Sequence, residues 1–219
     1  MHWGLFYTMI SAMETLSKLF SGEGRVKLMR LFLFNQTDLF SLEQIVNKAK
    51  VSTRMAKSEL DVLHKAGMIK NRKAVQVSKV KRRGKLVEVK KRLVCWHLDP
   101  DFEYLLPLQN LLINTRPLRK EEILRRLTSV GKLKMVVVSG VFIQNPDSRV
   151  DMLIVGDNLR RGAIDRIVKT MEAEIGKELV FASFETADFQ YRLGMYDKLI
   201  RDILDYPHQK LLDKLNLQG

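Results

Sequence analysis

Apolar residues recur at helical spacing through the first third of the chain. The run RVKLMRLFLF at 25–34 is typical of a buried helix. The stretch SLEQIVNKA predicts a short helix, because Ser41 followed three residues later by Gln44 forms a capping-box pattern. A third helix is expected to have Ser52 as its N-cap and to end at Gly67, with its apolar positions facing a core.

After that helix the pattern changes from helical spacing to strict alternation. Valines alternate at 75 and 77 and again at 87 and 89, on either side of Arg83-Gly84-Lys85. This pattern predicts a β-hairpin with a glycine near its tip. Between Lys70 and Arg92 there are 11 basic residues and one acid, so phosphates would be favourable counter-charges for the hairpin.

The second half of the chain alternates short apolar runs with helical patterns. Two helices are expected over 99–132, with a joint at Arg116-Pro117, because a residue before proline is disfavoured as helix. Three runs then predict strands (KLKMVVVSGVFI, buried on both faces, then RVDMLIVGD and ELVFASFET), and two predict helices (RRGAIDRIVKTMEAEIG and ADFQYRLGMYDKLIRDILDY). The whole order predicts an α+β fold, in which a small α/β domain follows a helical domain with a hairpin.

Charge divides the chain in the same way. Residues 1–130 contain 25 Lys and Arg against 12 Asp and Glu, whereas residues 131–219 contain 13 of each. The net charge of +13 therefore lies entirely in the first part. Such asymmetry indicates two units, one of which faces a polyanion.

Cysteine content and the N-terminal segment bear on the compartment. Cys95 is the single cysteine, which excludes an internal disulfide and fits a buried apolar role in a reducing cytoplasm. The opening MHWGLFYTMISAM is too short to span a bilayer and lacks the basic start of a secretory signal. We therefore expect a cytoplasmic protein with no membrane partner and with residues 1–12 as an apolar extension.

The order of three helices and a basic hairpin over residues 14–100 resembles bacterial and archaeal winged helix-turn-helix transcriptional regulators, especially at SLEQIVNKAKVSTRMAKSELDVLHKAGMIK. The resemblance implies that the third helix enters the major groove of DNA and that the hairpin, as the wing, grips the backbone or minor groove. It assigns to DNA binding Ser52, Thr53, Arg54, Lys57 and Ser58 on the helix, and Arg82, Arg83 and Lys85 at the wing tip. On periodicity alone, the helix residues also fit a solvated polar face.

The element order over 131–219 resembles the minimal nucleotidyltransferase fold of the polymerase-β superfamily. The resemblance implies a Gly-Ser pair after the first strand, and an Asp-x-Asp on the second that holds metal ions for in-line displacement. This chain has Ser139-Gly140 in reversed order, and Arg149 and Asp151 in place of the acidic pair. The third strand LVFASF contains no carboxylate. We therefore expect no catalytic residue, no metal site and no cofactor.

Two roles stay open for this degenerate nucleotide site of Ser139, Gly140, Arg149 and Asp151. Arginine suits bidentate phosphate binding, so in the first role Arg149 and the backbone around Ser139-Gly140 hold a nucleotide effector without metal. In the second role, Arg149 and Asp151 form a structural ion pair in a domain that serves only for dimerisation. The two roles differ in whether the protein binds nucleoside triphosphates.

The tail FETADFQYRLGMYDKLIRDILDYPHQKLLDKL, with the SGVF and RVD-LIVGD segments before it, resembles a lineage of small prokaryotic proteins that join a winged helix to a degenerate nucleotidyltransferase-like domain. The expected domains are a winged helix at 13–100, a helical linker at 101–130 and the nucleotidyltransferase-like domain at 131–219. We expect a transcriptional regulator that binds double-stranded DNA as a homodimer and is not an enzyme.

Three points of this interpretation have alternatives. The dimer surface is either the leucine-rich helix near 103–113 or the domain at 131–219, which has no net charge. An active nucleotidyltransferase would need Asp151 together with carboxylates such as those of Glu178, Glu185 or Asp188. An RNA-binding accessory protein would differ from a DNA-binding regulator in the outcome of competition between duplex DNA and RNA.

Overall fold

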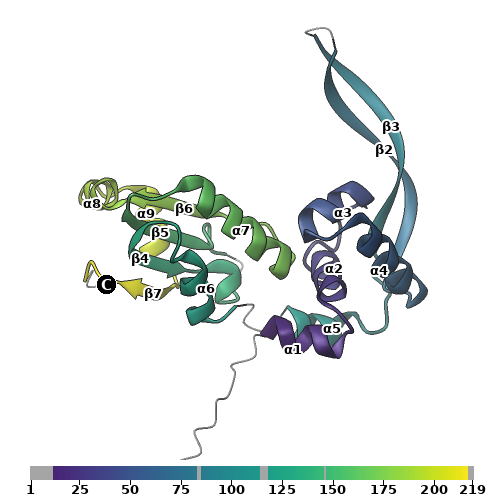
Figure 1. The fold of residues 1–219 in the computed structure, drawn as a ribbon, viewed down its shortest axis with the longest axis horizontal. Coiled ribbons are helices and arrows are strands. Elements are labelled where there is room, and N and C mark those ends of the chain that lie inside the picture. Colours follow the sequence, from purple (N-terminus) through teal and green to yellow (C-terminus); the bar gives the residue numbers. More distant parts are fainter. Residues whose placement is uncertain (1–11, 83–84, 114–117, 146, 217–219) are drawn as a thin grey trace, which may run out of the picture. The chain divides into compact units, whose positions relative to one another are not determined.

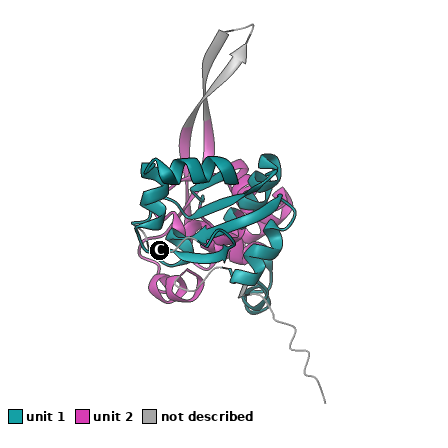
Figure 2. Ribbon diagram, turned by 90° about the vertical axis from the view of Figure 1, so that its left-hand side faces the viewer, with its two compact units in different colours: residues 1–23, 114–172, 178–219 teal, residues 24–113, 173–177 magenta. Residues whose placement is uncertain are grey.

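The computed structural model describes residues 12–82, 85–113, 118–145 and 147–216, with only the backbone described at residue 12 and over 76–82 and 85–91. The chain divides into two compact units (Figure 2). Unit 1 contains residues 1–23, 114–172 and 178–219, and unit 2 contains residues 24–113 and 173–177. Each unit combines helices with a β-sheet, so the predicted α+β class is confirmed. Within the described ranges, no helix has the length and apolar character needed to cross a membrane.

Unit 2 begins with helices and ends with a long hairpin followed by a helix (Figure 1). Its elements are α2 (Glu23–Phe34), β1 (Phe40–Ser41), α3 (Leu42–Ala49), α4 (Thr53–Lys65), β2 (Ile69–Arg82), β3 (Lys85–Leu98) and α5 (Leu105–Leu112). The sheet order is β1-β3-β2, and neighbouring strands are antiparallel. The predicted hairpin is therefore confirmed.

The helix starts of unit 2 follow from local side-chain chemistry. The Ser41 hydroxyl accepts a hydrogen bond from Gln44 N, and Ser41 N donates to the Gln44 side chain at 2.8 Å, which completes the predicted capping box of α3. The Ser52 hydroxyl accepts from Met55 N at 3.2 Å and caps α4. After α4, Gly67 adopts φ +80°, the left-handed conformation expected of a residue that ends a helix.

A buried arginine holds unit 2 together at its centre. Arg30 on α2 is 1% exposed, and burial lowers the pKa of its guanidinium from the ordinary value. Its Nε donates to Leu112 O at 3.0 Å, and its Nη1 donates to Glu174 O at 2.9 Å. Asn35 Nδ2 likewise donates to Gly176 O at 2.9 Å. Residues 173–177 are therefore tied to α2 as part of unit 2, although they lie far away in sequence.

The hairpin β2–β3 projects from unit 2 (Figure 1). Each strand has 14 residues, and the register runs without a break from Ile69 opposite Leu98 to Arg82 opposite Lys85. At about 3.3 Å per residue, each strand is roughly 45 Å long. Ile69, Leu98 and Cys95 are buried at its base, so Cys95 takes the buried position that we predicted.

Unit 1 is built on a four-stranded mixed sheet with strand order β6-β5-β4-β7. Its elements are α1 (Ala12–Leu19), α6 (Lys120–Leu127), β4 (Lys132–Val138), the 3₁₀ turn η1 (Gly140–Phe142), β5 (Met152–Asp157), α7 (Arg161–Ile175, whose end belongs to unit 2), β6 (Phe181–Glu185), α8 (Thr186–Gly194), α9 (Lys198–Leu204) and β7 (Gln209–Asp213). Strands β5 and β6 are parallel and joined through α7, whereas β4 is antiparallel to both β5 and β7. Apolar residues of β4 and β5 pack against Phe189 of α8 and against Ile200 and Ile203 of α9.

The structure of unit 1 corrects two predictions and adds one strand. The terminal helix is two helices, because the chain turns at Tyr196 with φ +56° and Asp197 then caps α9 through bonds from Leu199 N and Ile200 N. Strand β7 was not predicted from the sequence. The second strand begins only at Met152, so Arg149 and Asp151 precede it and do not share a strand face.

Candidate nucleic-acid interface

Helix α4 is amphipathic, with one face buried in unit 2 and the other exposed. Ala56, Leu60 and Leu63 are at most 4% exposed, as their spacing predicted. The opposite face contains the helix residues that we predicted to bind DNA. All of them are exposed: Ser52, Thr53, Arg54, Lys57 and Ser58. The Ser52 hydroxyl accepts the capping hydrogen bond. The side chains that follow Ser52 are therefore the ones available at this helix end for contacts with another molecule.

The N-terminal half of α4 has an uncompensated positive charge. Its one acid, Glu59, is neutralised by Arg25, with Nε to Oε2 at 2.7 Å. Arg54 and Lys57 form no ion pair with any residue that the structure describes. Lys65 at the other end of the helix is paired with Asp61 at 2.7 Å. The free cations therefore lie at the helix end where the backbone dipole is also positive.

The base of the hairpin adds a second group of exposed cations. Arg72, Lys73 and Arg92 are exposed, and within the described residues none of them has an acidic partner. Lys70 is different, because it binds Asp99 at 2.7 Å. That hydrogen bond raises the pKa of Lys70 and lowers the pKa of Asp99 from their ordinary values. Lys70 is thus less available to an external anion than its neighbours.

The residues assigned to the wing tip are only partly described. Arg82 and Lys85 are directly opposite each other at the far ends of β2 and β3. Their side chains, and all of Arg83, lie outside the described part of the chain. The basic residues at the hairpin base were not assigned to DNA from the sequence. The signal that could have found them is the run of basic residues between Lys70 and Arg92, which contains Arg72, Lys73 and Arg92 as well as the tip.

Three of the four residues of the predicted nucleotide site lie together, but in a closed arrangement. Asp151 is 6% exposed, and its carboxylate accepts hydrogen bonds from Val141 N and Val180 N, both at 2.9 Å. Ser139 is buried, and its hydroxyl donates to Val150 O. Gly140 has φ +55°, and a Cβ at this position would lie 2.1 Å from Asp151 Oδ1. The carboxylate therefore holds the turn after β4 and the start of β6 in place.

The fourth residue, Arg149, does not pair with Asp151, and this prediction was wrong. Arg149 Nη1 donates to Asp202 Oδ2 at 2.8 Å. The Arg149 side chain is 66% exposed, whereas both oxygens of Asp151 already accept backbone hydrogen bonds. Asp202 lies on α9, 53 residues later, so local spacing gave no signal for this partner.

The other carboxylates considered for catalysis also have structural contacts. Glu185 accepts from Asn158 N at 2.9 Å and from Leu159 N at 2.8 Å. Asp188 binds Arg192 at 3.0 Å, and Glu178 also has an interaction partner. Among the residues that the structure describes, no three His, Cys, Asp or Glu side chains are grouped so that they could hold a metal ion.

Comparisons of the chain with models of protein families, with curated proteins and with solved structures found no match. Function must therefore be inferred from the geometry of the two units. The feature with the most specific chemistry is the set of exposed cations without acidic partners among the described residues, on α4 and at the base of β2 and β3.

Proposed function

We propose that the protein is a sequence-specific, double-stranded-DNA-binding transcriptional regulator. One observation supports this most strongly: Arg54 and Lys57 on α4, and Arg72, Lys73 and Arg92 on the hairpin, are exposed cations without acidic partners among the described residues. Contacts between such cations and DNA phosphates lower the free energy of binding, because they release counterions condensed on the DNA. A basic face of this kind on a helix next to a hairpin suits a duplex.

Helix α4 and the hairpin would make different contacts with DNA. Helix α4 has 13 residues and is about 20 Å long, which fits the major groove of B-DNA. Its N-terminal residues Thr53, Arg54 and Lys57 would meet base edges there, as in a helix-turn-helix. An isolated two-stranded ribbon is marginally stable in water, so phosphate contacts would stabilise the hairpin as well as position the protein.

The first test is binding of the full-length protein to a pool of random duplexes, over a series of salt concentrations and with RNA as competitor. We expect tight, salt-sensitive binding that selects a consensus sequence. Absence of binding at low salt would overturn the proposed function. Equal competition by RNA of unrelated sequence would instead favour an RNA-binding accessory protein.

A second test concerns the hairpin tip. Replacing both Arg82 and Arg83 with Ala is expected to weaken binding to all duplexes alike and to reduce the slope of log K against log salt by about 1.8, since each phosphate contact contributes about 0.9. The matched control replaces Lys169 and Lys198 of unit 1, which removes the same charge elsewhere. Fluorescence anisotropy at several salt concentrations measures the slopes. An unchanged slope in the Arg82/Arg83 variant would mean that the tip does not contact phosphates.

We further propose that unit 1 is a nucleotidyltransferase-like domain without catalytic activity. The supporting observations are its strand arrangement, with β4 antiparallel to β5 and β5 parallel to β6, and the use of the Asp151 carboxylate by two backbone N–H groups. Metal-assisted transfer needs carboxylates that are free to bind cations. Such a unit would serve for assembly or for binding an effector.

We propose that the protein dimerises through the α8–α9 corner, formed by Tyr191, Met195, Tyr196 and Leu199. Tyr191 is 67% exposed and Tyr196 is 75% exposed, and the left-handed φ of Tyr196 is uncommon for a bulky residue. The corner is bordered by ion pairs, including Arg201 with Asp205 at 2.9 Å. A surface with apolar groups and both charge signs can complement its own copy across a two-fold axis.

The dimer surface can be tested with Tyr196→Asp. We expect the dissociation constant of the dimer to rise by at least about 30-fold, because a charge would replace a central aromatic contact. Sedimentation velocity measures the change. The comparison variant is Leu106→Asp on the leucine-rich helix α5, where Leu106 is also exposed. Dissociation by Leu106→Asp alone would assign the interface to α5.

A further inference from the structure

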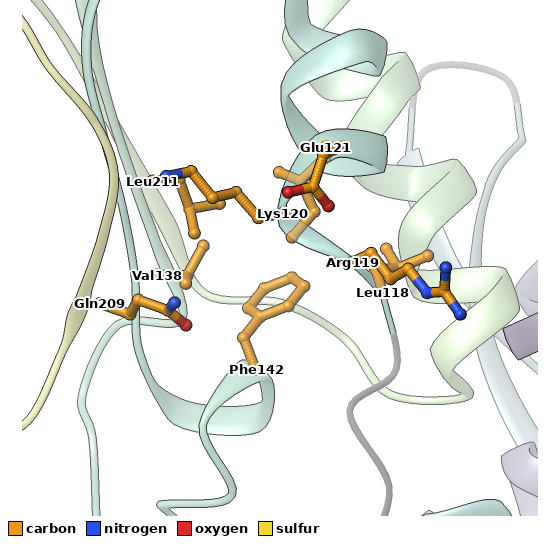
Figure 3. A pocket seen from close by; sticks show the side chains of 9 residues that line it. Leu118, Arg119, Lys120, Glu121, Val138, Phe142, Gln209 and Leu211 are labelled. Atoms are coloured by element: carbon orange, nitrogen blue, oxygen red, sulfur yellow. The ribbon is translucent and has the colours of Figure 1, made fainter. Parts of the chain in front are cut away.

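Unit 1 contains a cavity of about 290 Å³ beside the end of β4 (Figure 3). Its floor is apolar and buried, and its rim is polar and exposed. The floor residues are Leu118, Ile123, Val138, Phe142 and Leu211; the rim residues are Arg119, Lys120, Glu121 and Gln209. An apolar surface with a few polar groups at its edge is the usual composition of a small-molecule site.

An irregularity in the sheet helps to form this cavity. Pairing of β4 with β7 passes from Val136 opposite Leu212 to Val137 opposite Lys210, so Leu211 is an extra residue without a partner across the ladder. Leu211 is nevertheless 4% exposed and lines the cavity. Bulges of this kind redirect a side chain and are common next to binding sites.

The polar groups at the rim are free and of opposite charge. Figure 3 shows the Lys120 side chain extending from α6 toward Leu211, whereas the Arg119 guanidinium points away from the other lining residues. Within the described chain, the side chains of Lys120, Glu121 and Gln209 have no hydrogen-bond or ion-pair partner. The cavity thus offers one cation, one carboxylate and one amide above an apolar floor.

We propose that this cavity binds a free amino acid with an apolar side chain. Lys120 would bind the carboxylate of the ligand, Glu121 would accept from its ammonium group, and the side chain would lie on Phe142 and Leu211. The volume of about 290 Å³ lies just below the usual range for ligand sites, about 300–1,000 Å³, which fits a metabolite of this size and not a dinucleotide. The site goes beyond the proposed DNA binding and does not depend on it.

The test uses the full-length protein and each apolar amino acid in turn, at up to about 10 mM, with saturation-transfer NMR and calorimetry. We expect saturable binding of at least one of them, and at least tenfold weaker binding of hexanoate, which lacks the ammonium group, and of hexylamine, which lacks the carboxylate. Lys120→Ala and Glu121→Gln should each weaken binding about tenfold, because each removes a charge-assisted hydrogen bond.

Lys198→Ala is the matched control, because it removes an exposed charge from unit 1 outside the cavity and should leave the affinity unchanged. Circular dichroism checks that all three variants keep the fold. Three results would overturn the proposal: no saturable binding of any apolar amino acid, equally tight binding of hexanoate, or equal weakening by Lys198→Ala. None of them depends on whether the protein binds DNA.

Discussion

The Arg54→Ala protein is expected to bind its preferred duplex about 10-fold to 100-fold more weakly, while its binding to random DNA changes much less. The reason is that a bidentate arginine–base contact provides about 1–3 kcal/mol of discrimination, whereas phosphate contacts are shared by all sequences. Arg54 is exposed in the first turn of α4, on the face opposite the buried Ala56 and Leu60. Anisotropy titrations with the selected consensus and with a scrambled duplex measure both affinities.

Lys65→Ala provides the control on the same helix. Lys65 is at the C-terminal end of α4 and is paired with Asp61, so its loss should reduce both affinities slightly and leave their ratio unchanged. An equal loss on both duplexes for Arg54→Ala would place Arg54 on a phosphate and not on a base. In that case, specificity would come from other residues of α4 or from the shape of the DNA.

The second large effect is expected for Asp151→Ala, and it is an effect on stability. The substitution leaves Val141 N and Val180 N without their acceptor, which costs about 3 kcal/mol in total. Hydrogen exchange over β5 and β6 should then be about 100-fold faster, provided that these strands open together. Exchange in α2 and α3 of unit 2 is the internal reference.

Asp165→Ala is the matched variant, because Asp165 is an exposed aspartate on α7 that forms no ion pair with any residue that the structure describes. Its effect should stay within about 0.5 kcal/mol. The structural role would be contradicted if the unaltered protein had a nucleotidyl-transfer activity, and if Asp151→Ala abolished that activity while leaving hydrogen exchange in β5 and β6 unchanged. That result would favour the active nucleotidyltransferase.

The sequence predicted best those parts of the fold that depend on neighbours along the chain. The capping box at Ser41 and Gln44, the N-cap Ser52 and the paired strands of the hairpin are all local patterns, and the structure contains each of them. Gly67 was likewise assigned from its position after the last helical residue, and it has the left-handed φ. Such features are determined by contacts within a few residues.

The ion pair of Arg149, strand β7 and the cavity at Leu211 depend on residues far apart in sequence. One of the two roles left open paired Arg149 with Asp151, because both were placed on one face of the second strand, but the partner Asp202 is reached only when α9 folds onto the sheet. Strand β7 is too short to give a clear alternating pattern, and its place beside β4 is a tertiary contact. The cavity at Leu211 was missed for the same reason, since a bulge is a property of two strands and not of one.

The division of α7 between the two units has a consequence for the order in which the protein can fold during synthesis. The N-terminal stretch of unit 2 ends at residue 113, but the acceptors that Arg30 and Asn35 use at Glu174 and Gly176 are made 61 and 63 residues later. At about 5–20 residues per second, the ribosome needs several seconds to add them. During that interval α4 and the hairpin have been synthesised, but unit 2 still lacks residues 173–177. The basic part of the chain therefore completes its unit only after residues 173–177 have been made, and a chain that ends before them would contain an incomplete unit 2.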